Sequence, residues 1–340
     1  MKKLSRILAL TLSLVMVIFL AACGNTAAPA EETETEETEA AETAETEGEA
    51  TEATAGAEGL KIGATYYSLQ NEFTMRMDNQ AKKWAEANGV DYTGYDGDYN
   101  AATQLSQVET MIADGVDAII LNPQDADACA ACVDKAVEAG IPIVGVNTMV
   151  NSDKLTSYCG SQDVSAGEDI MQYMIDYLEN DEFNIVVIEG PMGQSAQLQR
   201  WEGINNILAD HPNIKILAVD TANWSRSEAM TLMETWITTY GDEINAVIGE
   251  NDEMALGARE AIKAAGMDIP CIGIDGITDA VTAVQNGDMI ASDFQNAEGQ
   301  IEGALNTAVA CVNGEEVEKE VWIPFEMITP DNYEEYVGRY

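Results

Sequence analysis

The sequence is 340 residues long and carries a formal net charge of −44. Its 60 acidic residues far outnumber its 16 basic ones, so attraction to nucleic acid or to an anionic lipid surface is excluded. With a single histidine, His211, the chain offers no His-based catalytic triad and no histidine-rich metal site, and we expect neither a metal nor a cofactor.

The first 22 residues have the features of a secretory signal. Three basic residues precede an unbroken apolar run from Ile7 to Leu20, which is too short for a permanent membrane span. Small residues and Cys23 follow directly, a pattern that resembles the lipobox of bacterial lipoproteins and predicts cleavage before Cys23 and lipidation of its thiol. A plain signal peptide with an incidental cysteine is the alternative.

The segment 23–59 is dominated by Glu, Thr and Ala. Residues 31–58 contain twelve Glu and no basic residue, so this stretch repels itself, buries nothing and is expected to be a disordered tether. The residues after Gly59 still carry a charge of −35.

Apolar runs alternate with helical stretches throughout the rest of the chain. The expected strands are 60–66, 90–95, 117–121, 141–146, 156–159, 184–189, 214–220, 245–249, 270–274 and 289–293, and the clearest expected helices are 73–88, 101–114, 163–179 and 195–209. Alternating strands and helices predict parallel sheets that are covered on both faces. About 280 residues exceed one comfortable core, so the pattern predicts an α/β protein with two lobes.

Five cysteines lie beyond Cys23, an odd number. Cys129 and Cys132 form a C-x-x-C pair, which can indicate redox or zinc chemistry. The pair lies in a helical pattern, however, and no second ligand pair has zinc spacing, so buried free thiols are the favoured interpretation.

No enzyme signature is present. The chain lacks a G-x-G-x-x-G after its first strand and lacks a G-x-x-x-x-G-K-[ST] loop. Carboxylates are so frequent that pairs with any spacing occur by chance, and they cannot indicate a two-carboxylate hydrolase.

Polar and aromatic residues instead recur where the expected strands end, and ligands of open parallel sheets bind in the crevice at those ends. The candidate ligand-binding residues are Asn71, Phe73, Asn147, Asp163, Arg200, Trp224, Asn251, Asp275 and Gln295. Each alone could be a helix cap, a turn residue or a core aromatic. Together they supply donors, acceptors and ring faces for a neutral polyol.

Several of these stretches are similar to the type I periplasmic sugar-binding proteins, and most similar to the ribose-binding protein and its relatives. The resemblance rests on residues 251–258 (NDEMALGA), 272–276 (IGIDG), 119–123 (IILNP), 68–73 (SLQNEF) and 195–203 (SAQLQRWEG), and it covers residues 60–330. It implies two Rossmann-like lobes joined by a three-crossing hinge, with a sugar bound between them.

The resemblance also implies particular boundaries and site residues. One lobe should comprise 60–161 plus 296–324 and the other 162–295 plus 325–340, with crossings near 161–163, 293–296 and 323–325. The nine candidates fall on the family's ligand positions. Asn147 and Thr148 stand where ribose binders carry a charged pair, and Thr74 replaces a second aromatic, so a different pentose, a hexose or a cyclitol is open.

The resemblance therefore implies an extracytoplasmic binding protein, not an enzyme. It would capture a neutral sugar or cyclitol by hinge closure and deliver it to the permease and ATPase subunits of an ABC importer. The chain would be a monomer held by lipid on Cys23 at the outer face of the bacterial cytoplasmic membrane. Presentation of the ligand to a membrane sensor kinase or chemoreceptor is the alternative. A carbohydrate-active enzyme is a third hypothesis, and a sugar-responsive transcription regulator is discarded because a signal stands where its DNA-binding helices would be.

Overall fold

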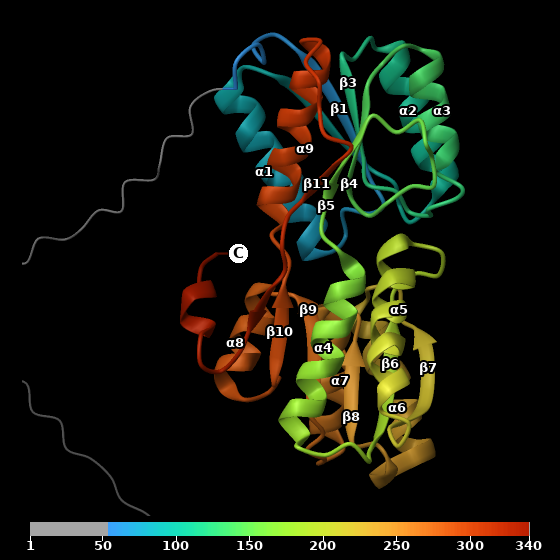
Figure 1. Ribbon diagram of the computed structural model, residues 1–340, viewed down its shortest axis with the longest axis vertical. Coiled ribbons are helices and arrows are strands. Elements are labelled where there is room, and N and C mark those ends of the chain that lie inside the picture. Colours follow the sequence, from blue (N-terminus) through green and yellow to red (C-terminus); the bar gives the residue numbers. More distant parts are fainter. Residues whose placement is uncertain (1–53, 340) are drawn as a thin grey trace, which may run out of the picture. The chain divides into compact units, whose positions relative to one another are not determined.

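The computed structural model describes residues 54–339. The expected signal segment, Cys23 and nearly all of the expected tether lie outside these residues. Within the described part, twelve strands form two separate six-stranded sheets (Figure 1).

The first sheet forms the centre of one lobe, which we call the first lobe. Its spatial order is β11-β5-β4-β3-β1-β2, and every neighbouring pair is parallel. The strands are β1 (Lys61–Tyr66), β2 (Asp91–Asp96), β3 (Ala118–Leu121), β4 (Ile143–Asn147), β5 (Ser157–Gly160) and β11 (Glu320–Trp322). The central strands are apolar on both faces because helices cover both faces.

Those helices pack in pairs on the first sheet. They are α1 (Glu72–Asn88), α2 (Ala101–Ala113), α3 (Ala130–Glu138) and α9 (Ala297–Val312). Ala118 and Ile120 contribute to the core beneath α1 and α9, whereas Ile119 and Leu121 contribute to the core beneath α2 and α3. Successive side chains of β3 therefore alternate between two buried layers, as the strand pleat requires.

The second lobe repeats this arrangement. Its sheet has the order β12-β10-β9-β8-β6-β7, and its strands are β6 (Asn184–Glu189), β7 (Lys215–Thr221), β8 (Ala246–Gly249), β9 (Cys271–Asp275), β10 (Ala291–Phe294) and β12 (Glu326–Ile328). Only β12 is antiparallel to its neighbour. The helices are α4 (Asp163–Leu178), α5 (Ser195–Asp210), α6 (Arg226–Tyr240), α7 (Asp252–Ala264) and α8 (Thr278–Asn286). Short 3₁₀ helices, η1 (Gly241–Glu243) and η2 (Tyr333–Tyr336), complete it.

The two sheet orders correspond strand for strand. β1 occupies the place in its sheet that β6 occupies in the other, and the same holds for β2 and β7, β3 and β8, β4 and β9, and β5 and β10. The expected α/β fold with two parallel-sheet lobes is confirmed. The chain passes between the sheets after β5, after β10 and after β11.

The short strands β11 and β12 were not expected from the sequence. Each has only three residues, and two of the three side chains of β11 are exposed. They are strands because β11 pairs with β5 and β12 pairs with β10, and these partners lie far away in the sequence.

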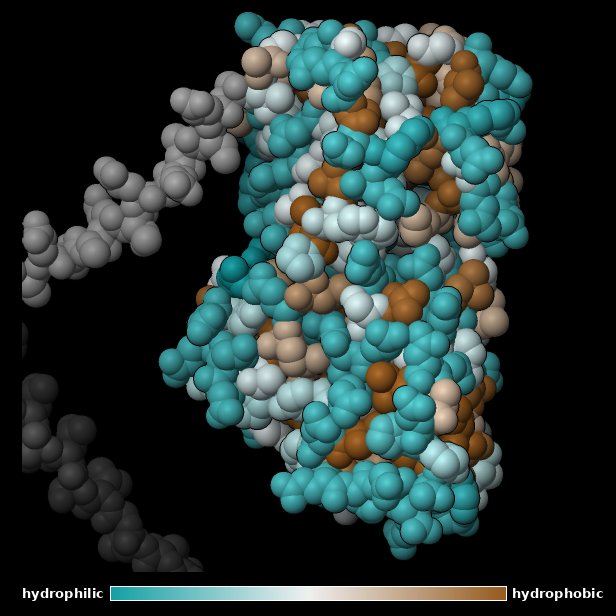
Figure 2. All heavy atoms as spheres, viewed as in Figure 1, coloured by the Kyte–Doolittle hydropathy of each residue, from teal (hydrophilic) through white to brown (hydrophobic). Residues whose placement is uncertain are grey.

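The surface of the described residues is largely hydrophilic, with apolar residues in scattered patches on the face that Figure 2 shows. None of the helices between residues 54 and 339 is both long enough and apolar enough for a membrane span. Four cysteines in this part of the chain are buried, Cys311 is half-buried, and all five are free thiols.

Candidate ligand-binding site between the lobes

A partly enclosed cavity lies where residues from the ends of strands in both sheets meet. Its lining residues are Tyr67, Asn71, Phe73, Asn147, Thr148, Gln194, Ala196, Arg200, Trp224, Asn251, Glu253, Asp275, Ile277 and Gln295. The empty volume between these residues, including the mouth, is about 390 Å³. We call this cavity the inner cavity.

The structure brings eight of the nine sequence-predicted residues to the walls of the inner cavity. The exception is Asp163, the first residue of α4, which is fully buried beside Arg200 and does not line the cavity. It therefore lies where it can position a wall residue rather than contact a ligand.

Two of the wall residues are also helix caps, the alternative role that the sequence allowed for them. Asn71 Oδ1 accepts a hydrogen bond from the backbone N–H of Thr74 at 3.1 Å at the start of α1. Asn251 Oδ1 accepts one from Met254 N–H at 3.0 Å at the start of α7. Each cap fixes the side chain, because the amide oxygen is held by its own helix.

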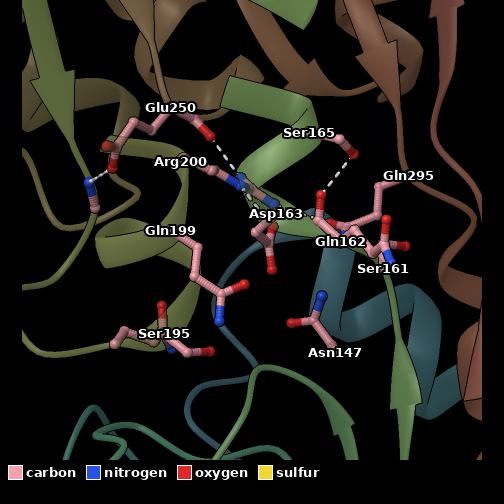
Figure 3. A network of polar contacts seen from close by, with 12 residues as sticks. Asn147, Ser161, Gln162, Asp163, Ser165, Ser195, Gln199, Arg200, Glu250 and Gln295 are labelled. Carbon is pink, nitrogen blue, oxygen red and sulfur yellow. Dashed lines mark hydrogen bonds and ion pairs between the residues drawn. The ribbon is translucent and has the colours of Figure 1, made fainter. Parts of the chain in front are cut away.

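Arg200 is the central cation of the site (Figure 3). Its Nε donates to Asp163 Oδ1 at 2.9 Å, and its Nη1 donates to the backbone carbonyl of Glu250. Nη2 donates to Gln295 Oε1 at 3.3 Å. Arg200 is 3 % exposed, so its ion pair with Asp163 is shielded from water and the guanidinium is rigid.

Buried carboxyls surround this cation. Burial raises the pKa of Glu250, Asp275 and Asp293 well above the ordinary range, and the charge of Arg200 opposes that rise at each of them. Burial also raises the pKa of Asp163, again against the effect of Arg200. These four carboxyls hold protons more readily than carboxyls in water do, and Asp275 is the one among them that lines the inner cavity.

On the first lobe, Asn147 is fixed from two sides. Its Oδ1 accepts from Asn122 Nδ2 at 3.2 Å, and its backbone carbonyl accepts from the Tyr158 hydroxyl at 2.6 Å. Asn122 Nδ2 also donates to the Thr148 hydroxyl at 3.0 Å. The neutral pair at 147–148 is thus part of a buried amide and hydroxyl network.

Six of the seven non-glycine residues with positive φ among residues 54–339 form matching sets in the two lobes. Asn147 ends β4 with φ 63°, and Asp275 ends the corresponding β9 with φ 127°. Asp98-Tyr99 after β2 and Asn223-Trp224 after β7 have φ values between 50° and 60°. Such conformations cost about 1–3 kcal/mol each and cluster at functional sites.

Five further wall residues were not predicted from the sequence: Tyr67, Gln194, Ala196, Glu253 and Ile277. The hydroxyl of Tyr67 accepts from Asn71 Nδ2 at 3.1 Å, and Gln194 Oε1 accepts from Trp224 Nε1 at 2.5 Å. Glu253 pairs with Arg226 at 2.6 Å. Tyr67 directly follows β1, so the strand-end signal was present there and was overlooked. Gln194 and Glu253 lie four or more residues beyond the ends of β6 and β8, so the strand ends gave no signal for them.

Hydrogen bonds join the two lobes beside the inner cavity. Met149 N–H of the first lobe donates to Ser195 Oγ of the second at 2.6 Å. Ala126 N–H donates across to the carbonyl of Gly193 at 3.1 Å. Trp224 and Phe73, from opposite lobes, are only 4 % and 6 % exposed, so the cavity excludes most water.

Amides, carboxyls, one guanidinium and aromatic rings therefore converge on a small closed space. This set can donate to and accept from several hydroxyls at once and can cover apolar ring faces. No group of three or more His, Cys, Asp or Glu side chains within residues 54–339 is arranged to hold a metal ion. Fold and site together define a two-lobed binding protein for a small hydroxyl-rich solute.

Comparison with known proteins gives the family. The model of the periplasmic binding protein domain matches residues 62–316, and the chain belongs to this family, as a solute-binding protein of the sugar-binding ABC transporter type. The chain is 38 % identical to a xylitol-binding protein of Mycolicibacterium smegmatis, over 82 % of this chain and 79 % of the relative. It is 32 % identical to a ribose import binding protein of Bacillus subtilis, over 79 % and 87 %.

A solved structure supports the same assignment. An ABC transporter solute-binding protein from Bacillus halodurans, determined with bound myo-inositol, has a TM-score of 0.79 and 36 % identity to this chain. The match covers 84 % of this chain and all of the other. These relatives are extracytoplasmic binding proteins and not enzymes, and this chain is one as well.

Proposed function

We propose that the chain captures a single neutral cyclitol or sugar ring in the inner cavity. The observation that carries this proposal is the inner cavity, whose polar and aromatic walls come from both lobes. Relatives named for xylitol, ribose and myo-inositol point to the same class of ligand. The neutral residues Asn147 and Thr148 favour a ligand gripped by hydrogen bonds rather than by charge.

Capture would proceed by hinge closure. We propose lobes of 60–161 plus 296–324 and 162–295 plus 325–340, with the crossings as the hinge. A ligand that contacts both lobes binds the closed form more tightly than the open form, and this difference shifts the equilibrium toward closure. Closed protein is then recognised by the permease.

The wall residues have separate roles in this proposal. Arg200 donates to ligand hydroxyls, and Asp275 accepts from them or, when protonated, donates. The side chains of Asn71, Asn147, Asn251 and Gln295 supply further donors and acceptors, and Phe73 and Trp224 cover the ring faces. A buried polar wall rejects analogues that lack a matching hydroxyl, because its own groups would be left unpaired.

Titration calorimetry tests the proposal with a panel of myo-inositol, scyllo-inositol, xylitol, ribose, xylose, arabinose and galactose. At least one should bind with a micromolar dissociation constant, which corresponds to about 8 kcal/mol. Trp224→Ala should weaken binding of that compound at least tenfold. Tyr177→Ala, at an exposed position on α4, should leave it unchanged. If no member of the panel binds, the proposed ligand class is wrong.

We propose further that Cys23 carries lipid and that 24–59 tethers the binding domain to the outer face of the cytoplasmic membrane. The sequence pattern around Cys23 supports this proposal. Cells fed a radiolabelled fatty acid should label the intact protein, and Cys23→Ser should abolish the label and release the protein from the membrane fraction. Labelling that persists in Cys23→Ser would contradict the anchor.

A further inference from the structure

A second, larger cavity adjoins the inner one. Its empty volume, including the open space at its mouth, is about 1200 Å³. Asn71, Trp224 and Glu253 belong to the walls of both cavities. We call it the outer cavity. Like the inner cavity it is built by both lobes, since Gln124 comes from the first and Asn223 from the second. A group attached to a ring in the inner cavity can therefore extend outward between the same two lobes.

The outer cavity has an aromatic residue from each lobe in its wall, at corresponding places in the fold. Tyr99 follows β2 and Trp224 follows β7, which are the corresponding edge strands of the two sheets. Both have left-handed backbones, with φ of 51° and 60°, and each is the second residue of a left-handed pair. Bulky residues occupy this region only where the surrounding structure holds them there.

A strained aromatic in both lobes is not explained by the inner cavity. Trp224 lines the inner cavity as well, whereas Tyr99 lines only the outer one. Tyr99 also contacts Tyr67, with ring centroids 5.8 Å apart, so its ring is supported from behind. Aromatic rings in cavity walls suit the C–H faces of sugars.

A polar wall residue adds an independent observation. Gln124 lines the outer cavity, and its buried Oε1 has no hydrogen-bond partner among the described residues. A buried acceptor without a partner is costly, and a ligand hydroxyl would satisfy it once the amide turns toward the outer cavity.

We propose that the outer cavity is a second subsite, which binds the distal ring of a glycosylated cyclitol or of a disaccharide whose first ring occupies the inner cavity. This assignment rests on the proposed function of the inner cavity. Tyr99 and Trp224 cover the distal ring from the two lobes, and Gln124 accepts from one of its hydroxyls. The preferred ligand is then a neutral glycoside larger than a single ring.

Matched pairs of compounds test this assignment by titration calorimetry: myo-inositol with galactosyl-myo-inositol, xylose with xylobiose, and arabinose with arabinobiose. For at least one pair the glycoside should bind about tenfold more tightly than its parent ring. Tyr99→Ala and Gln124→Ala should each remove most of that gain and change binding of the parent ring less than threefold.

The control and the contrary outcomes separate this inference from the proposed function. Tyr177→Ala removes an exposed tyrosine from α4, far from either cavity wall, and should preserve the gain. If a parent ring binds but every glycoside binds more weakly, the second subsite is refuted while the inner site stands. A gain that survives both Tyr99→Ala and Gln124→Ala also refutes it. If neither parents nor glycosides bind, the proposed function itself fails.

Discussion

Arg200 is the residue on which the charge balance of the inner cavity depends. Its guanidinium is 3 % exposed and neutralises Asp163 in a buried ion pair of 2.9 Å. Loss of one partner of a buried pair costs about 3–5 kcal/mol, since the other charge is left without compensation.

Arg200→Ala should therefore both destabilise the protein and abolish ligand binding. We expect the free energy of unfolding in urea to fall by about 3–5 kcal/mol and the affinity for the bound solute to fall at least 100-fold. Lys154→Ala, which breaks an exposed pair with Asp134, should alter neither quantity. Unchanged stability in Arg200→Ala would mean that the buried pair is not formed in solution.

Asp275 combines two unfavourable features, a φ of 127° and a buried carboxyl. Glycine adopts this φ without strain, so Asp275→Gly should raise the free energy of unfolding by about 1–2 kcal/mol. The same variant should weaken ligand binding at least tenfold, because a wall carboxyl is lost.

Glu179 provides the matched comparison. It ends α4 with φ 48° and is exposed, away from both cavities. Glu179→Gly should stabilise the protein without changing ligand affinity. If Asp275→Gly instead lowered stability in the same series of thermal melts, the backbone at Asp275 would not be strained in the way we propose.

At the scale of elements, α4 and α5 are packed closely enough to have their backbones in contact. A Cβ on Gly203 would lie 2.0 Å from the Val164 carbonyl oxygen, and one on Gly167 would lie 2.1 Å from that of Arg200. These helices carry Asp163 and Arg200, so their separation fixes the ion pair.

Gly203→Ala should push the two helices apart. Overpacking of this kind costs about 1–3 kcal/mol, and the shift of Arg200 should also reduce ligand affinity several-fold. Asn205→Ala, on the exposed side of α5, is the control and should change affinity little. Denaturant unfolding and calorimetry on the same samples measure both effects. If the ligand affinity of Gly203→Ala equals that of the parent protein, the packing of α4 against α5 does not control the site.

Much of the fold was predictable because most of its strands are buried runs of apolar residues, and because glycines and helix-capping residues mark where the neighbouring helices end and begin. The strands β1 to β10 begin and end within two residues of those expected, whereas β11 and β12 were not expected. The positions at the strand ends were predictable for the same reason, since parallel strands deliver Asn251 and Asp275 to one edge of the second sheet and Asn147 to the corresponding edge of the first. Residues such as Gln194 were not predictable, because its place follows from the contact with Trp224, which lies 30 residues away.

Across the whole molecule, stability should depend on pH through the buried carboxyls. Burial raises the pKa of Glu250, Asp275 and Asp293 in the folded state. In the unfolded chain the same carboxyls have ordinary pKa values of about 4. Above that pH the folded protein holds protons that the unfolded chain has released. The stability gained from these protons is complete at low pH and is lost as pH rises through the folded pKa values.

The melting temperature should therefore be higher at pH 5 than at pH 8, in the absence of ligand. Relief of repulsion within a chain of net charge −44 acts in the same direction. Asp293→Asn removes a carboxyl whose Oδ2 is buried without a hydrogen-bond partner, so this variant should melt higher at pH 8 and show a smaller difference between the two pH values. A melting temperature that rises with pH would contradict the protonated state of these groups.

The position of the Trp224 indole should allow ligand binding to be followed by tryptophan fluorescence. It donates to Gln194 at 2.5 Å, lies 5.5 Å from the Arg200 guanidinium carbon, and borders both cavities. A solute arriving beside it must alter the polarity and the quenching that the indole experiences. The chain thus carries its own optical reporter, and the intensity and wavelength of its ultraviolet emission should follow occupancy in real time without any attached dye.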